Sequence, residues 1–267
     1  MSERPVIDIE DGSEFDEALV ISCFPSEGFV SSIVAHFLVD KLGLELVGGI
    51  RHSGLPPVCL VQEGSPLPPN RLYSGVPVCN VDKCDKVVLI ASEIQISPDL
   101  KLPIASEILD WMSESGAGMS IMIDSYAHGE GQKHSIFDED KSPDTVVGIG
   151  SNENSREMLK EIGATLLKQG VVGGMTGVML GESRRRKMDS LAVIAESGGE
   201  FSGGGIPDAR AAARIIECLD GLLPAVKLDP EPLLEEAQRI EGQIREMMAL
   251  HLNSESDVVS APSTMYG

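Results

Sequence analysis

The sequence predicts a three-layer α/β/α domain built around a mostly parallel sheet. Short apolar runs alternate along the chain with segments of helical periodicity, which is the pattern of α/β proteins. The runs at 18–24 and 44–50 enclose a helical segment, 26–43, and so predict a βαβ unit with parallel pairing and a right-handed crossover. No break in composition and no internal repeat divides the chain. We therefore expect one domain over residues 1–252 and a flexible tail over 253–267.

The remaining elements follow from the same criteria. Residues 1–17 are polar and acidic and predict a surface lead-in. Proline recurs in the stretch 51–84 and excludes a central strand there, so we expect a β-ribbon or an edge excursion with short strands at 58–62 and 76–80. Further along the chain we expect, in order, a strand at 86–91, a helix at 102–115, a strand at 119–124, a loop at 125–144, a strand at 145–149, a helix at 152–162, a strand at 190–195, a helix at 207–221 and a long helix at 230–248. The long helix carries a short heptad seam, which fits packing on its own domain as well as a coiled coil.

The stretch 170–181 contains five glycines among Val, Met and Leu and leads into a basic run at 184–187. It predicts a buried loop that enters a helix running outward to the surface. Glycines there would either cradle a phosphate at the helix N-terminus or permit close helix–sheet packing. The stretch lacks the Gly-Lys-Ser/Thr ending of a P-loop and the GxGxxG of dinucleotide sites, which favours close packing. The basic run fits the C-terminus of this helix, where its charge complements the dipole, or a docking patch for an acidic surface.

An enzymatic alternative depends on the carboxyl ends of the strands, where open parallel sheets usually bind ligands. Asp124 ends a strand, and the loop after it is rich in Gly, His and Asp. In a nucleoside phosphorylase- or hydrolase-like enzyme, Asp124 and His128 would line a ligand cleft together with Gly173, Gly174 and Thr176. The sequence shows no nucleophile placed with a histidine and an acid, so we predict no catalytic residues and no cofactor.

The loop at 125–144 also raises the question of a metal. It holds His128, His134, Asp138 and Asp140, and imidazole and carboxylate groups are common metal ligands. Their spacing matches no known ligand set, and a polar loop is rich in such residues in any case. We therefore predict no metal site.

The strongly negative net charge disfavours nucleic acids and anionic membranes as binding partners. Lys and Arg total 21 against 42 Asp and Glu, which gives a formal charge of −21. Such acidity disfavours binding to nucleic acid or to an anionic membrane, and it suits a salty cytoplasm or a basic partner. The five cysteines contain no CxxC motif, which indicates reduced thiols. Without a signal-peptide pattern or an apolar run of membrane-spanning length, the sequence predicts a soluble cytoplasmic protein.

The residues Met265, Tyr266 and Gly267 differ from the polar stretch before them. A disordered segment normally lacks large apolar and aromatic side chains, yet here a methionine adjoins one of only three tyrosines. A tyrosine ring offers buried area and one hydrogen bond, and a free carboxylate pairs with a lysine. This layout predicts a tether whose end docks into a pocket of another protein.

Four segments carry a resemblance to a known family. They are ALVISCFPSEGFVSSIVAHFLVDKLGLELVG from residue 18, GVVGGMTGVMLG from residue 170, SLAVIAES from residue 190, and IPDARAAARIIECLDGLLPAVKLDPEPLLEEAQRIE from residue 206. On these motifs, which lie within residues 18–245, the chain resembles the archaeal proteasome assembly chaperone family.

The resemblance implies a phosphorylase/hydrolase-like α/β/α core without an established enzymatic role, and a homo-oligomer. It also implies assembly of the proteasome α-ring or ATP-independent activation of the proteasome. Some members end in a hydrophobic–tyrosine–any tail that inserts between adjacent α-subunits of the proteasome core particle. Met265, Tyr266 and Gly267 match that tail position by position; the departure is Met, whose flexible side chain orders at a greater entropic cost. Docking of the tail to a different partner is a third possibility.

Overall fold

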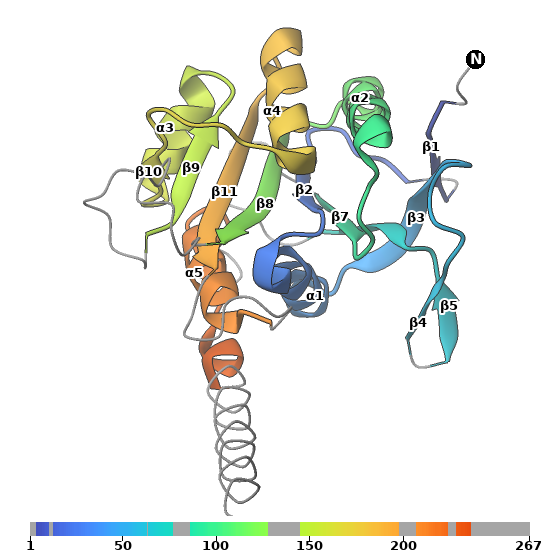
Figure 1. Ribbon diagram of the computed structural model, residues 1–267, viewed down its shortest axis with the longest axis horizontal. Helices are drawn as coiled ribbons and strands as arrows, with labels where there is room; N and C mark the ends of the chain where they lie inside the picture. Colours follow the sequence, from blue (N-terminus) through green and yellow to red (C-terminus); the bar gives the residue numbers. More distant parts are fainter. Residues whose placement is uncertain are drawn as a thin grey trace, which may run out of the picture.

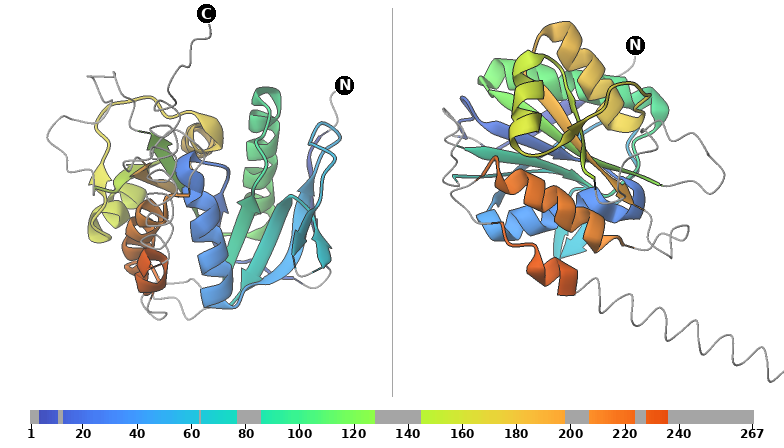
Figure 2. Two further views of the ribbon diagram at one scale, coloured as in Figure 1. Left: turned by 60° about the horizontal axis from the view of Figure 1, so that its bottom comes forward. Right: turned by 90° about the vertical axis from the view of Figure 1, so that its left-hand side faces the viewer.

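The computed structural model describes residues 4–10, 13–62, 64–76, 86–127, 145–197, 207–223 and 228–235. In this part of the chain a nine-stranded sheet has helices on both faces (Figures 1 and 2). The helices are η1 (Glu27–Phe29), α1 (Val30–Leu42), α2 (Pro98–Ser115), α3 (Glu153–Glu161), α4 (Gly174–Arg186) and α5 (Ala209–Asp220). The helices α1 and α5 pack on one face, and α2 and α4 pack on the other. The predicted three-layer α/β/α architecture is confirmed.

The sheet has the strand order β1-β3-β6-β7-β2-β8-β11-β9-β10. The strands are β1 (Val6–Ile9), β2 (Leu19–Cys23), β3 (Glu45–Arg51), β6 (Asn70–Gly75), β7 (Val87–Ser92), β8 (Met119–Ala127), β9 (Val147–Gly150), β10 (Thr165–Leu166) and β11 (Ser190–Ser197). The four central strands, β7, β2, β8 and β11, pair in parallel, as the sequence predicts for the middle of the sheet. On one side the pairing is antiparallel to the edge, at β6–β7, β3–β6 and β1–β3. On the other side β11–β9 is antiparallel and the edge pair β9–β10 is parallel.

Burial on both faces explains why the central strands are continuous apolar runs. Every residue of β2 and β7 is buried. Along β2, Ile21 points into the core under α1 and α5, and its neighbour Val20 points into the core under α2 and α4. Both faces of these strands therefore favour apolar side chains, and the polar residues of β2 and β7 are the small, buried Ser22 and Ser92.

One pairing prediction was wrong. The strand β3 does run parallel to β2, but β6 and β7 lie between them, so the two ends of the expected βαβ unit do not pair. The cause is the strand β6, which returns antiparallel from the proline-rich excursion and takes the place beside β7. Proline does not exclude β6, because the strand lies between Pro69 and Pro77 and contains no proline itself.

The excursion itself contains the predicted ribbon. The strands β4 (Leu60–Gln62) and β5 (Ser65–Leu67) pair with each other in a separate two-stranded sheet. The strand expected at 76–80 lies outside the described residues except for Val76, which no strand includes.

Several further boundaries differ from the expected ones, and α2 begins at Pro98 where the sequence analysis expects 102. The lead-in at 1–17 contains the edge strand β1, which pairs with β3. The strand β8 continues to Ala127, so the loop begins later than Ser125. In α5, Asp208 is the N-cap, and its carboxylate accepts a hydrogen bond from the Ala211 N–H at 2.9 Å. The two-residue strand β10 has no signal in the sequence that could separate it from a turn.

Several predictions fall outside the described residues. Of the long helix at 230–248, residues 231–235 are helical and the rest is not described; neither is the tail at 253–267.

Cys23 and Cys218 are buried free thiols, and Cys59 is exposed. Among the helices that the structure describes, none combines the length and the apolar character of a membrane span.

Candidate functional site

A pocket of about 560 Å³ opens at the carboxyl ends of the central strands, between η1 and the start of α4. The residues that line it come from the ends of β2, β7, β8 and β11, from η1 and the start of α1, and from the glycine stretch: Phe24, Pro25, Ser26, Glu27, Gly28, Phe29, Ser32, Glu93, Gln95, Asp124, Ser125, Tyr126, Val171, Val172, Gly173, Gly174, Met175, Thr176 and Ile194. Of the residues expected in a ligand cleft, Asp124, Gly173, Gly174 and Thr176 lie together here. His128 lies outside the described residues.

Asp124 joins β8 to the start of α4. Its carboxylate accepts the Ser125 N–H at 2.8 Å and a hydrogen bond from the side chain of Thr176, which lies in the first turn of α4. Burial raises the pKa of Asp124, the hydrogen bonds from Thr176 and Ser125 oppose this rise, and the Glu27 carboxylate adds to it. The Asp124 carboxyl group therefore links the end of β8 to the first turn of α4.

Glu93 is the second acid of the pocket with defined partners. It pairs with the buried Arg71 and with His36, whose Nε2 lies 3.3 Å from a carboxylate oxygen of Glu93. Burial raises the pKa of Glu93, but the hydrogen bonds from His36 and Arg71 outweigh it and bring the pKa below its usual value. Glu27 is the third acid, and none of the described lining residues is Lys, Arg or His. This charge distribution disfavours a phosphate.

The glycine stretch is a turn that enters the helix α4, as its sequence predicts, but its loop is not buried: Val171 is 80% exposed, and a Cβ atom at Gly173 or Gly174 would meet nothing within 4 Å. Close packing is confined to Gly177 among the glycines of α4. Gly174 has φ +68°, a left-handed conformation that glycine adopts without strain. At Gly177 a Cβ atom would lie 2.1 Å from the carbonyl oxygen of Val172, so only glycine fits without a shift of the backbone. The apolar side chains of Met175 and Met179 are buried in the core on this face of the sheet.

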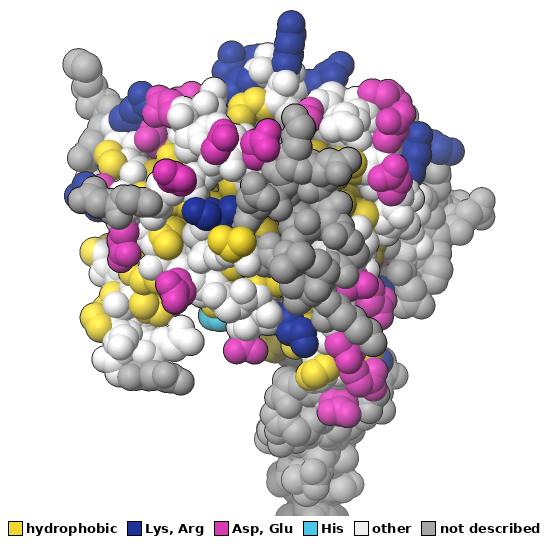
Figure 3. All heavy atoms as spheres, turned by 180° about the vertical axis from the view of Figure 1, so that it is seen from behind, with side chains coloured by type: hydrophobic (Ala, Val, Ile, Leu, Met, Phe, Trp, Pro, Cys, Tyr) yellow, Lys and Arg dark blue, Asp and Glu magenta, His cyan; other side chains and the backbone are white. Residues whose placement is uncertain are grey.

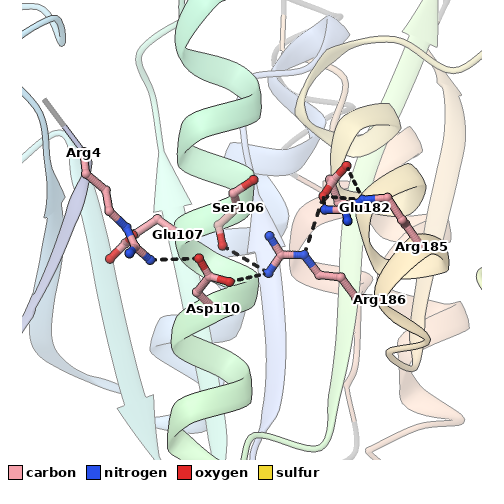
Figure 4. Close-up of polar contacts among 7 residues, drawn as sticks. All are labelled: Arg4, Ser106, Glu107, Asp110, Glu182, Arg185 and Arg186. Atoms are coloured by element: carbon pink, nitrogen blue, oxygen red, sulfur yellow. Dashed lines mark hydrogen bonds and ion pairs between the residues drawn. The ribbon is translucent and has the colours of Figure 1, made fainter. Parts of the chain in front are cut away.

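The basic run at 184–187 is used within the fold (Figure 4). Arg186 donates to Asp110 of α2 at 2.6 Å and thereby joins α4 to α2. Asp110 also accepts a hydrogen bond from Arg4 at 2.8 Å, which brings the segment before β1 into the same network. Arg184 donates to the Ser151 carbonyl at 2.8 Å. These contacts and the position at the end of α4 favour the helix-terminus interpretation over a docking patch.

The sequence analysis missed the opposite wall of the pocket. Gly28 and Phe29 in η1 are both left-handed, with φ +59° and +53°. A Cβ atom at Gly28 would lie 2.3 Å from Ser197 Oγ, and the Gly28 carbonyl accepts the Asp208 N–H at 2.8 Å. The only signal for this turn in the sequence is the glycine two residues after Ser26. Glu93 had an equally weak signal, its position directly after a buried strand.

The other predicted sites are not placed. Met265, Tyr266 and Gly267 lie outside the described residues, as do His134, Asp138 and Asp140. Within the part of the chain that the structure describes, no group of three or more His, Cys, Asp or Glu side chains is positioned to hold a metal ion.

Comparison with known proteins identifies the family. The profile of the PAC2 family matches residues 20–248. The Methanocaldococcus jannaschii protein MJ0106 is 28% identical over 239 residues, which cover 90% of this chain and 89% of that protein. A crystal structure of Pyrococcus furiosus PbaA, described as an archaeal homolog of proteasome-assembly chaperone, is 28% identical, with a TM-score of 0.77 over 96% of both chains.

A second solved structure supports the fold. Pyrococcus furiosus PbaB, described as an archaeal proteasome activator, superimposes with a TM-score of 0.72 at 19% identity, over 92% of this chain and 99% of that one. Since the family profile covers most of the chain, this protein belongs to the PAC2 family.

Proposed function

We propose that this protein is a proteasome assembly chaperone or an ATP-independent proteasome activator. The observation that carries the proposal is the match to PbaA, which extends over 96% of both chains at 28% identity. The family assignment over residues 20–248 supports it. Such a protein works by binding, so it needs no catalytic residue and no cofactor. The partner in this proposal is the proteasome core particle, and the place of action is the cytoplasm.

The proposed mechanism uses the segment Met265–Gly267. A homo-oligomer would present several copies of it, and each would insert between adjacent α-subunits of the core particle. The Tyr266 ring would supply buried area and one hydrogen bond. One such segment binds weakly, and several on one body gain avidity when their spacing matches the sites on the α-ring.

The pocket favours this binding role over the enzymatic alternative. Its Asp124 carboxylate is held by Thr176 and Ser125, and its Glu93 carboxylate is held by Arg71 and His36. These contacts account for both acids as parts of the fold. A phosphorylase would also need cationic groups around its phosphate, and the described lining residues include none.

The test is co-sedimentation of the purified protein with proteasome α-subunits. We compare the full chain with Tyr266→Ala and with a chain that lacks Met265–Gly267, and Ser263→Ala serves as a matched control in the same segment. We expect the full chain and Ser263→Ala to co-sediment and both tail variants to lose binding, with unchanged circular dichroism. Undiminished binding of Tyr266→Ala would refute the tail mechanism, and no binding by the full chain would refute the proposed function.

A further inference from the structure

The pocket between η1 and α4 lies where the chain path diverges to the two faces of the sheet. The connection after β2 leads to α1 on one face, and the connection after its neighbour β7 leads to α2 on the other. In open α/β sheets such a divergence leaves a crevice at the carboxyl ends of the strands, where ligands bind. The pocket volume of about 560 Å³ also lies in the range of small-molecule sites, about 300–1,000 Å³. The fold therefore provides room for a ligand here.

The charged side chains that line this pocket are all acidic. On the face of the molecule shown in Figure 3, Asp and Glu side chains lie among Lys and Arg side chains. The described lining of the pocket differs, because it contains Glu27, Glu93 and Asp124 but no Lys, Arg or His. The charge of Glu93 is compensated by its ion pairs with Arg71 and His36. The two other acids therefore decide which charge a ligand should carry.

Asp124 and Glu27 are neighbours without a counter-charge. The partners of the Asp124 carboxylate, the Ser125 N–H and the Thr176 side chain, are both neutral. Ser125 Oγ donates to the Glu27 carbonyl at 2.6 Å, which holds Glu27 beside the end of β8. Burial, and to a smaller extent the Glu27 carboxylate, raises the pKa of Asp124. Among the ion pairs of the described residues, none includes Asp124 or Glu27.

The N-terminus of α4 supplies too little positive charge to balance these two carboxylates. A helix N-terminus acts as about half an elementary charge, and its effect falls off within the first turn. The pocket therefore keeps a negative potential and favours a cation. A divalent metal ion fits it poorly, because the described residues include no group of three or more His, Cys, Asp or Glu side chains positioned to hold one.

The rim of the pocket is apolar. Phe29 of η1 is 50% exposed and Val171 in the segment before α4 is 80% exposed, and both line the pocket. Between Val171 and α4, Gly173 and Gly174 have open space where a side chain would lie, so the entrance is not blocked there. A ligand with a charged end and an apolar stem would cover Phe29 and Val171 while its charge reaches the acids. An aromatic ring near a cation adds a further attraction.

We propose that this pocket binds a primary alkylammonium group, with the ammonium beside Asp124 and Glu27 and the alkyl chain against Phe29 and Val171. An ammonium carries three hydrogen-bond donors, so one group can serve both carboxylates. The same chemistry comes from a free polyamine or from a lysine side chain of a partner protein, and the test separates these two sources. This binding site goes beyond the proposed function and does not depend on it.

The first test is isothermal titration calorimetry with the full chain. The probes are spermidine and a peptide with one lysine between two leucines. The same peptide with acetylated lysine is the matched control, because acetylation removes the charge and keeps the stem. Binding of spermidine alone identifies a free amine as the ligand, and tighter binding of the peptide identifies a partner lysine; the acetylated peptide should bind at least tenfold more weakly than its parent. No binding of either amine, or equal binding of the two peptides, would overturn the proposal.

The second test locates the site with three variants that each remove one negative charge. Asp124→Asn and Glu27→Gln act in the pocket, whereas Glu45→Gln acts at the exposed start of β3, at the amino end of the strands. We expect each pocket variant to weaken amine binding at least tenfold and Glu45→Gln to leave it unchanged, all with the circular dichroism spectrum of the original chain.

Equal weakening by all three variants would overturn the proposal, since the amine would then respond only to the net charge of −21. If Asp124→Asn alters the fold through its contact with α4, Glu27→Gln decides alone. Binding to the proteasome is measured separately by co-sedimentation, so failure of this site and failure of the proposed function are distinguishable.

Discussion

Replacing Arg71 by methionine tests the buried charge beside the pocket. The Arg71 side chain is 2% exposed, and its guanidinium pairs with Glu93 and donates to the Pro68 carbonyl at 3.2 Å. It also lies 5.8 Å from the centre of the Tyr73 ring. Methionine keeps an apolar stem of similar reach and removes the charge, so the variant isolates the electrostatic contribution of this residue.

The expected loss of stability follows from the Glu93 carboxylate, which the substitution leaves without its arginine partner. Removing one partner of a fully buried ion pair costs about 3–5 kcal/mol, because the other charge stays buried and unpaired. Here the side chain of Glu93 is 24% exposed and keeps its contact with His36, which reduces the penalty. Loss of the cation–π contact adds about 0.5–1 kcal/mol. We therefore expect Arg71→Met to lower the free energy of unfolding by about 2–4 kcal/mol at pH 7.

The loss of stability caused by Arg71→Met should also depend on pH. The pKa of Glu93 is lowered in the fold, because the hydrogen bonds from His36 and Arg71 outweigh the effect of burial. A group with a lowered pKa stabilises the fold above its unfolded pKa, about 4.3 for Glu, and this contribution is lost as the pH falls. Since Arg71→Met removes one of the hydrogen bonds that lower this pKa, the difference between the two proteins should shrink below about pH 4.

Urea unfolding followed by circular dichroism measures both effects, at pH 7 and again below about pH 4. Arg156→Met is the matched control, because Arg156 forms an exposed pair with Glu153 and its loss should change stability little. A loss below about 1 kcal/mol at pH 7, or the same loss at both pH values, would refute the reasoning.

Three further substitutions test α4 and its contact with β8. The raised pKa of Asp124 means that the fold favours its protonated form, so the original chain should lose stability relative to Asp124→Asn as the pH rises through that pKa. Melting temperatures of both proteins from pH 4 to 8 measure this loss. A difference in melting temperature that stays constant with pH would contradict the prediction. Gly177→Ala should destabilise by about 1–3 kcal/mol, because its Cβ would meet the Val172 carbonyl. Gly181→Ala in the same helix, with nothing within 4 Å, should instead stabilise by about 0.5–1 kcal/mol, and effects of the same sign in thermal unfolding would contradict both.

The candidate site was predictable in part. Asp124 and the glycine stretch end or begin elements that meet at the carboxyl edge of a parallel sheet, and the structure brings Asp124, Gly173, Gly174 and Thr176 to one pocket. The sequence could not indicate what their side chains do there. That Asp124 holds the start of α4 depends on a hydrogen bond from Thr176 across about fifty residues of chain, and no local pattern encodes such a contact.

The same limit applies to the opposite wall. Glu93 forms ion pairs with Arg71 from β6 and with His36 from α1. These two elements lie far apart in the sequence, so no local pattern predicts the contacts. The left-handed turn at Gly28 and Phe29 depends on packing against Ser197 and Asp208, which lie far along the chain. Both features arise only when distant segments are brought together.

The sequence by itself determined the types and approximate bounds of most elements and, through its motifs, the resemblance to the chaperone family. These are local properties, because apolar runs, helical spacing and breakers act over a few residues. Only the tertiary structure decided that β6 and β7 separate β3 from β2 and that β1 joins the edge of the sheet. Strand order is a choice among distant partners whose backbone groups are chemically alike, so it depends on how the whole sheet packs and not on any one segment.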